Sequence, residues 1–149
     1  MDDNINKKIN MIAEEKGYIR HKYLEDLNIP INKYGINFFD NTDPRYPKWM
    51  EYKKEYGFDP RETWNLDQIF YEWLYEHVKA YQELNCVNTE YHRFKIGENE
   101  YTQEEAMNKL LKCLKYLITH NNYDNIEKYE KKYNKAMKIW AEICPAMWW

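Results

Sequence analysis

The sequence predicts a mainly α-helical bundle with a small β-hairpin near residues 91–101. Glycine and proline are scarce, at 4 and 5 of 149 residues, whereas a turn-rich β-sandwich or barrel needs many of both. Three long segments repeat apolar residues at helical spacing, and each follows a capping sequence. Long amphipathic helices joined by short connections favour a bundle.

The length suits one domain over residues 1–149. Within it, residues 1–46 are expected to be the looser part, and residues 47–149 the bundle core. Aromatic residues reach 17% of the chain, and 15 of them are tyrosines. A tyrosine ring packs while its hydroxyl reaches water or a partner, so many of these side chains should lie at a core edge or on a contact surface.

The N-terminal elements are predicted to be short. Isoleucines at helical spacing over 5–13 indicate a first helix that stops at Gly17. Residues 23–27 indicate a second helix, which ends before Pro30. Residues 30–46 contain several turn-forming residues and are expected to form an irregular connector.

The middle of the chain contains the central helix. Pro47 is expected to open a short helix that ends at Gly57. Asp59 and Pro60 then form a start signal, with a capping carboxylate and a proline at the first helical position. The following stripe is predicted to face the core, and it consists of Leu66, Ile69, Phe70, Trp73, Leu74, His77, Tyr81 and Leu84.

Two more helices follow the segment 91–101, which alternates like a hairpin or an extended loop and turns at Gly97. Residues 102–105 form a capping box. The helix after it should bury Ala106, Met107, Leu110, Leu111, Leu114, Leu117 and Ile118. Residues 124–127 cap the last helix, which Pro145 ends. Its predicted apolar stripe consists of Ile126, Tyr129, Tyr133, Met137, Trp140 and Cys144.

The three cysteines are Cys86, Cys113 and Cys144. Their wide spacing matches no zinc-ligand pattern. Cys113 and Cys144 fall on apolar helix stripes, where a free thiol acts as a small hydrophobic group. The reducing cytoplasm therefore fits best. No apolar run reaches the roughly 20 residues of a membrane span, so no membrane partner is expected.

Four carboxylates lie on the central helix: Asp67, Glu72, Glu76 and Glu83. A di-iron bundle would need a Glu-x-x-His pair on each of two helices. Here His77 directly follows Glu76 and no second copy exists, so no metal or other cofactor is predicted. The expectation is a solvated acidic face, with His77 at the core edge, that is available to a protein partner.

A basic stripe is predicted on the last helix, formed by Lys128, Lys131, Lys132, Lys135 and Lys138. A phosphate backbone could lie along it. The alternative is a solvated face partly neutralised by Glu127, Glu130 and Glu142. The net charge of −3 is not that of a protein that binds nucleic acid over its whole surface.

For four of the tryptophans the sequence leaves two interpretations open, a buried and an exposed side chain. Trp148 and Trp149 at the chain end either fold back onto the bundle or form an exposed apolar patch of the kind that binds a partner. Trp49 and Trp64, which flank the turn at Gly57, have the same two readings. No phosphate-binding glycine motif and no catalytic spacing around the histidines is present. The sequence does not decide whether the chain is an enzyme, and the lack of a recognised catalytic motif favours a non-enzymatic protein.

The segment from Gly57 to Leu84 carries a glycine and an aromatic residue, and then Glu62-Thr63-Trp64-Asn65-Leu66-Asp67 before an amphipathic helix. This acidic-x-Trp-x-Leu-Asp pattern resembles a group of small phage and prophage helical proteins. The resemblance covers about a third of the chain. Structurally, Asn65 is expected to cap the helix, and Trp64 and Leu66 to enter the core.

The resemblance implies a phage source, and small phage proteins without catalytic motifs often act by binding. The leading interpretation is a non-enzymatic protein that binds a host protein and inhibits a bacterial defence effector, as anti-CRISPR proteins do, in the cytoplasm of the host cell. The alternatives are a virion or assembly protein that forms a homo-oligomer, and a nucleic-acid-binding module that uses the lysine stripe.

Overall fold

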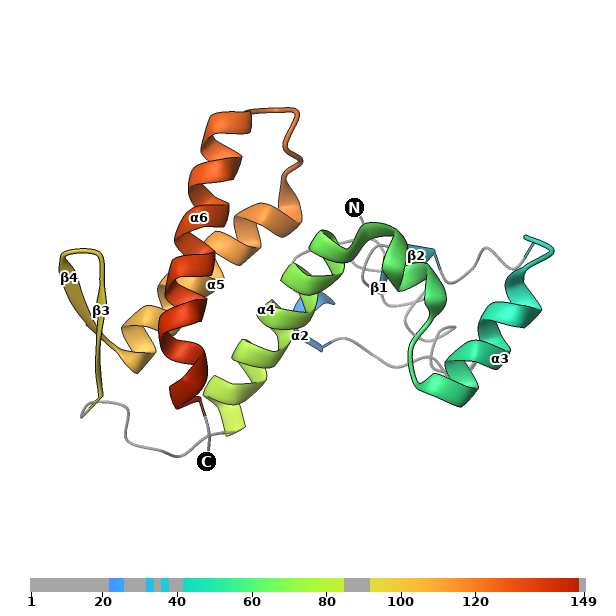
Figure 1. Cartoon of the computed structure of the whole chain (residues 1–149), viewed down its shortest axis with the longest axis horizontal. Helices are drawn as coiled ribbons and strands as arrows, with labels where there is room; N and C mark the ends of the chain where they lie inside the picture. Colours follow the sequence, from blue (N-terminus) through green and yellow to red (C-terminus); the bar gives the residue numbers. More distant parts are fainter. Residues whose placement is uncertain (1–21, 26–31, 34–35, 38–41, 85–91, 148–149) are drawn as a thin grey trace. The chain divides into compact units, whose positions relative to one another are not determined.

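The structure is a computed structural model that describes residues 22–25, 32–33, 36–37, 42–84 and 92–147 (Figure 1). Most of these residues are helical, and two short antiparallel strand pairs complete them. The prediction of a mainly α-helical fold with a hairpin is confirmed. In chain order the elements are α2 (Lys22–Glu25), β1 (Asn32–Lys33), β2 (Ile36–Asn37), α3 (Tyr46–Tyr56), the 3₁₀ helix η1 (Pro60–Asn65), α4 (Leu66–Leu84), β3 (Arg93–Ile96), β4 (Asn99–Thr102), α5 (Gln103–Thr119), α6 (Ile126–Ile143) and the 3₁₀ helix η2 (Cys144–Ala146).

The chain divides into two compact units, Met1–Trp73 (unit 1) and Leu74–Trp149 (unit 2), and the boundary falls within α4. The single domain expected over residues 1–149 stays a prediction. The first helix expected over 5–13 lies outside the described residues. None of the described helices combines the length and the apolarity that a membrane span requires.

In unit 1, the second predicted helix is present as α2, and its Leu24 is buried. The expectation of a wholly irregular connector is wrong, because β1 and β2 pair antiparallel with Asn32 opposite Asn37. Strands of two residues are too short to leave an alternating pattern in the sequence. This pairing was therefore not predictable from periodicity.

The helix starts and stops of unit 1 follow the predicted signals. Gly57 ends α3 in the left-handed conformation, with φ of 84°, and its N–H donates to the carbonyl of Lys53. A residue with a side chain would be strained there. Asp59 caps η1 by accepting a hydrogen bond from the backbone N–H of Arg61. η1 then runs directly into α4, so Asn65 ends one helical segment instead of opening an isolated one.

The buried face of α4 differs from the predicted one. The fully or nearly buried apolar residues are Tyr71, Leu74, Tyr75 and Val78. Of the expected stripe, only Leu74 is buried, whereas Leu66 and Leu84 are 62% and 60% exposed. The predicted and the observed sets of buried residues both have helical spacing. They are offset by about one residue, which is roughly 100° around the helix. Because α4 carries apolar and aromatic residues on more than one side, periodicity alone could not choose between them.

Beyond the end of α4, unit 2 contains the predicted hairpin. β3 pairs antiparallel with β4, Phe94 lies opposite Tyr101, and Gly97 turns the chain with φ of 66°. The predicted capping box follows directly. The Thr102 hydroxyl accepts from the backbone N–H of Glu105 at 3.1 Å, and the Glu105 carboxylate accepts from the backbone N–H of Thr102 at 2.8 Å. This exchange fixes the first residue of α5.

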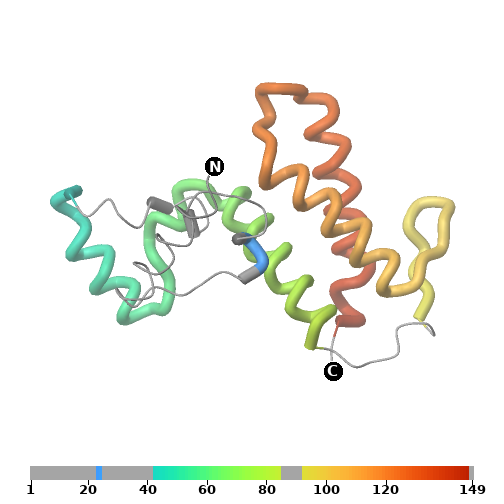
Figure 2. The backbone as a smooth tube through the Cα atoms, turned by 180° about the vertical axis from the view of Figure 1, so that it is seen from behind, coloured from blue at the N-terminus to red at the C-terminus, as the bar shows by residue number. Residues whose placement is uncertain are grey.

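α5 and α6 fold back on each other and form the core of unit 2 (Figures 1 and 2). All seven residues of the stripe predicted for α5 are buried. From α6, the buried residues are Ala136, Ile139 and Ile143. The stripe predicted for α6 is wrong in part, because Ile126 is 59% exposed, Tyr133 is 41% exposed and Cys144 is exposed. Small and β-branched residues fit against α5, and the larger rings lie at the edge of the contact.

Two isoleucines on α6 test this assignment of faces. Ile139→Ala should lower the free energy of unfolding by about 2–5 kcal/mol, because it opens a cavity against α5. Ile126→Ala, on the same helix and with the same chemistry, should change it by no more than about 0.5 kcal/mol. Urea denaturation followed by circular dichroism measures both. Equal losses for the two variants would refute the observed orientation of α6.

Candidate functional site

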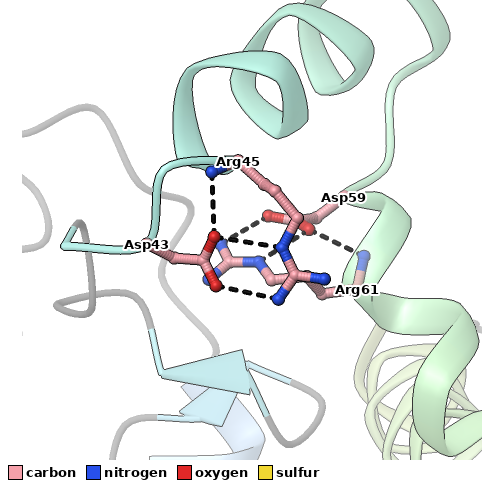
Figure 3. A network of polar contacts seen from close by, with 4 residues as sticks. All are labelled: Asp43, Arg45, Asp59 and Arg61. Carbon is pink, nitrogen blue, oxygen red and sulfur yellow. Dashed lines mark hydrogen bonds and ion pairs between the residues drawn. The ribbon is translucent and has the colours of Figure 1, made fainter.

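Unit 1 contains the same tripeptide twice, as Asp43-Pro44-Arg45 and Asp59-Pro60-Arg61. The first copy lies directly before α3, and the second opens η1. The two copies have the same hydrogen bonds (Figure 3). In the first, Oδ1 of Asp43 accepts from the backbone N–H of Arg45 at 2.8 Å and from its Nε at 3.0 Å, and Oδ2 accepts from Nη2 at 2.8 Å. In the second, the three corresponding distances are 2.9, 3.0 and 2.7 Å.

The proline explains why both copies fold alike. Its ring fixes φ near −65° and removes a backbone donor that the first turn of a helix does not use. The aspartate can then cap the turn and hold the guanidinium in a two-pronged ion pair at the same time. In both copies the residue after the arginine donates its backbone N–H to the carbonyl of the aspartate, at 3.0 Å for Tyr46 and 2.9 Å for Glu62. One short sequence therefore both forms a turn and fixes the direction of an arginine.

The two ion pairs differ in burial. The side chains of Arg61 and Asp59 are 7% and 1% exposed, whereas those of Arg45 and Asp43 are 63% and 26% exposed. Hydrogen bonds from the side chain and then the backbone of Arg45 lower the pKa of Asp43 from 3.8 to about 2. The same carboxylate raises the pKa of Arg45. Both side chains of the exposed pair therefore stay charged at every physiological pH.

Both guanidiniums lie over the same indole. The Cζ atoms of Arg45 and Arg61 are 4.9 and 4.8 Å from the ring centroid of Trp49. Arg45 is also 5.5 Å from the Trp64 ring, and Arg61 is 5.6 Å from the Tyr46 ring. We call these five residues the arginine–tryptophan cluster. Cation–π contacts hold it together, and each cation is itself fixed by an aspartate.

Trp64 is the exposed edge of the cluster. Its ring meets Trp49 edge to face, with centroids 5.4 Å apart and planes at 83°. Nevertheless 63% of its surface stays exposed. The expectation that Trp64 and Leu66 enter the core is therefore wrong. A 3₁₀ helix turns every three residues instead of every 3.6, so η1 carries Trp64 away from the buried face of α4.

More aromatic side chains line the neighbouring part of unit 1. Tyr52 contacts Tyr56 and Phe58, with ring centroids 4.5 and 5.5 Å apart. These three residues are 37%, 57% and 40% exposed. Large apolar side chains that stay exposed in one segment are unusual on a surface without a partner.

The four carboxylates predicted on α4 have different surroundings. Asp67 and Glu83 are exposed, and Glu76 is half-buried. The expectation of a fully solvated acidic face is wrong at Glu72, which is 1% exposed and accepts a hydrogen bond from Nε2 of Gln68 at 3.0 Å. His77 is exposed and not at the core edge. Within the described part of the chain, no three acidic, histidine or cysteine side chains gather in a way that could hold a metal ion.

The remaining predicted candidates lie in unit 2 or beyond. The α6 lysines are exposed, apart from the half-buried Lys132. Lys131 forms an ion pair with Glu127 at 2.7 Å. Cys113 is buried, and burial raises the pKa of its thiol despite the opposing charges of nearby lysines. Trp148 and Trp149 lie outside the described residues.

The arginine–tryptophan cluster was missed from the sequence. The capping role of Asp59 was recognised, but the identical tripeptide at Asp43 was not. The repeat of Asp-Pro-Arg before two aromatic segments was the available signal. No sequence pattern indicates that both arginines contact the same indole, that of Trp49.

The exposed ion pair predicts an unusual titration. Carbon-detected NMR of the Asp43 carboxyl should give a midpoint near pH 2, below the ordinary 3.8. Because the folded-state pKa is depressed, the stabilisation is present above the ordinary pKa and disappears as the pH falls from about 4 to 2. Arg45→Gln should move the midpoint upwards, though not fully, because the backbone hydrogen bond remains. An unchanged midpoint in this variant would contradict the assigned cause.

The buried ion pair predicts a stability difference between the two arginines. Arg61→Ala should destabilise unit 1 by about 3–5 kcal/mol, because it strands the buried Asp59 carboxylate. Arg45→Ala removes an exposed pair and should have a far smaller effect. Denaturant unfolding followed by tryptophan fluorescence compares the two. A larger loss for Arg45→Ala would overturn the assignment of Asp59–Arg61 as the structural pair.

Comparisons with protein-family models, with curated protein sequences and with solved structures find no match to this chain. Its function is therefore argued from its own residues.

Proposed function

We propose that the chain is a non-enzymatic binding protein that acts by occupying a surface of a bacterial host protein, with Trp64 at the centre of the contact. One observation carries this proposal. The Trp64 indole is 63% exposed, yet it is held in place by the edge of Trp49 and the guanidinium of Arg45.

An exposed but fixed indole favours binding for two reasons. Covering it removes a large apolar area from water, which releases about 25 cal/mol for each Å². Its orientation is already set, so little side-chain entropy is lost when a partner covers it. Tryptophan, tyrosine and arginine are also the residues that most often dominate the energy of protein contacts.

The neighbouring side chains extend the same surface. Tyr52, Tyr56 and Phe58 contribute exposed rings, and Leu66 is 62% exposed. The ion pairs neutralise the two arginines of the cluster. A partner would thus be recognised by shape and ring area more than by charge.

The class of partner comes from the resemblance to small phage proteins. In the segment that carries it, Glu62 to Asp67, the side chains of Trp64, Leu66 and Asp67 are exposed. Residues that make up this pattern are thus available to a partner instead of being used by the core. This supports an inhibitor of a bacterial defence effector, such as a CRISPR effector, acting in the cytoplasm of the host.

The test compares three forms of the full chain: the unchanged protein, Trp64→Ala, and the control Tyr133→Ala, which removes a ring that is 41% exposed on α6. Each is titrated against purified CRISPR effector complexes while target-DNA cleavage is measured. The unchanged protein and Tyr133→Ala should inhibit at a near-stoichiometric ratio. Trp64→Ala should weaken inhibition about 30-fold, as expected for a dominant contact worth about 2 kcal/mol.

Other results would overturn the proposal. Inhibition far below stoichiometry would indicate an enzyme. Equal inhibition by Trp64→Ala would remove this surface from the contact, and no inhibition of any effector would remove the partner class. Light scattering over a range of concentrations supplies a separate check. Self-association lost in Trp64→Ala would assign the surface to a second copy of the chain, as in an assembly protein.

A further inference from the structure

The five lysines of α6 do not form one face. From helical geometry, Lys128, Lys132 and Lys135 share the edge that borders the buried residue Ile139. Lys131 and Lys138 lie farther round the helix, towards solvent. Of the five lysines in the predicted stripe, three therefore lie beside α5.

α5 adds to this group from the other side of the helix pair. Lys132, Lys135 and, from α5, Lys109 all act electrostatically on the buried Cys113 thiol. α5 therefore adds positive charge to this part of unit 2, and the Lys109 ammonium lies 4.9 Å from the ring centroid of Tyr101. Such a concentration of like charge is unfavourable by itself and favours an anionic partner.

Tyr116 of α5 is at the centre of this basic face. The ammonium groups of Lys128 and Lys132 are 5.0 and 5.9 Å from its ring centroid. His120 stacks on the same ring, with centroids 4.0 Å apart and planes at 11°. Two cations and two stacked rings are therefore held together where α5 ends and α6 begins.

The loop between α5 and α6 presents a third ring. Tyr123 is 87% exposed, the largest exposure among the large hydrophobic and aromatic side chains described. Its backbone is nevertheless fixed, because Oδ1 of Asn121 accepts from the N–H groups of Tyr123 and Asp124 at 2.9 and 3.1 Å. We call Tyr116, His120, Tyr123, Lys128, Lys132 and Lys135 the Tyr116 face.

We infer that the Tyr116 face binds single-stranded nucleic acid, with the lysines on the phosphates and the exposed Tyr123 ring stacked on a base. This inference is independent of the partner proposed for unit 1. The three lysines rise along α6 by about 6 Å and then about 4.5 Å. A row of cations beside aromatic faces is the arrangement by which proteins hold unpaired strands without reading their sequence.

The alternatives to an unpaired strand fit less well. An acidic protein would use the lysines but would leave the exposed Tyr123 ring without a role. A duplex offers phosphates but no open base for stacking. Acidic side chains on α6 leave most of this charge in place: Glu127 pairs with Lys131 on the outer side, and Glu130 lies on the opposite side of the helix. Glu142 is on the side of Lys135 but about two turns farther along α6.

The experiment measures the binding of the full chain to a fluorescein-labelled single-stranded oligonucleotide of about 15 nucleotides by anisotropy over a range of salt concentrations. The test variant is Lys128→Gln/Lys132→Gln. The control is Lys131→Gln/Lys138→Gln, which changes the net charge equally on the same helix. A third variant, Tyr123→Ala, removes only the stacking ring.

The test variant should reduce the magnitude of the slope of log affinity against log salt by about 1.4, because each lysine–phosphate contact that forms releases about 0.7 of a counterion and two such contacts are lost. The control should leave that slope nearly unchanged. Tyr123→Ala should weaken binding about fivefold or more without altering the slope.

Four results would overturn the inference. The first is no binding at low salt, and the second is an equal loss in the control variant. The third is equal affinity for the matching duplex, which would exclude stacking on an open base. The fourth is full competition by poly-glutamate of equal charge, which would assign the face to an acidic protein.

Discussion

Helix starts fixed by side-chain hydrogen bonds are the constraint on which both units depend. Asp59, Thr102 and Asn125 each accept from a backbone N–H two or three residues into the helical segment that follows. Asp43 accepts from the N–H of Arg45 in the turn directly before α3. Each such cap stabilises a helix by about 0.5–2 kcal/mol. Because few glycines and prolines are available to interrupt the helices, these side chains mark the starts of η1, α5 and α6.

In unit 1 the same caps also build the candidate site. An aspartate that only capped a helix could be replaced by serine or asparagine with little consequence. Here each aspartate also binds the arginine two residues later, and both arginines lie over Trp49. The position of the exposed Trp64 ring therefore follows from the hydrogen bonds of these two aspartates.

The helix boundaries could be predicted from the sequence because their causes are local. The stop at Gly57, the capping box of α5 and the hairpin turn at Gly97 depend only on residues a few positions apart. The face of α5 was also predictable, because its apolar residues occupy one side. The faces of α4 and α6 were not, because rings lie around both helices: the buried face of α4 includes Tyr71 and Tyr75, whereas that of α6 consists of the smaller Ala136, Ile139 and Ile143.

The candidate sites depended on contacts between segments, and such contacts leave no periodic signal. Nothing in the spacing of Arg45 and Arg61 indicates a shared indole. The lysines of α6 were visible as a stripe, but only the position of α5 separates Lys128 and Lys132, over the Tyr116 ring, from Lys131, which pairs with Glu127. Composition nevertheless gave a useful indication, because an aromatic fraction of 17% exceeds what a small core can bury.

The two surfaces differ in whether their positive charges are paired with carboxylates. In unit 1 each arginine of the cluster has an aspartate bound to it, so the exposed rings are left to supply the contact. Burial of rings changes little with salt. On the Tyr116 face the cations lie over a ring, which has no net charge to neutralise them, and contacts to phosphate weaken steeply as salt rises. Salt dependence is therefore the physical property by which a partner of one surface can be distinguished from a partner of the other.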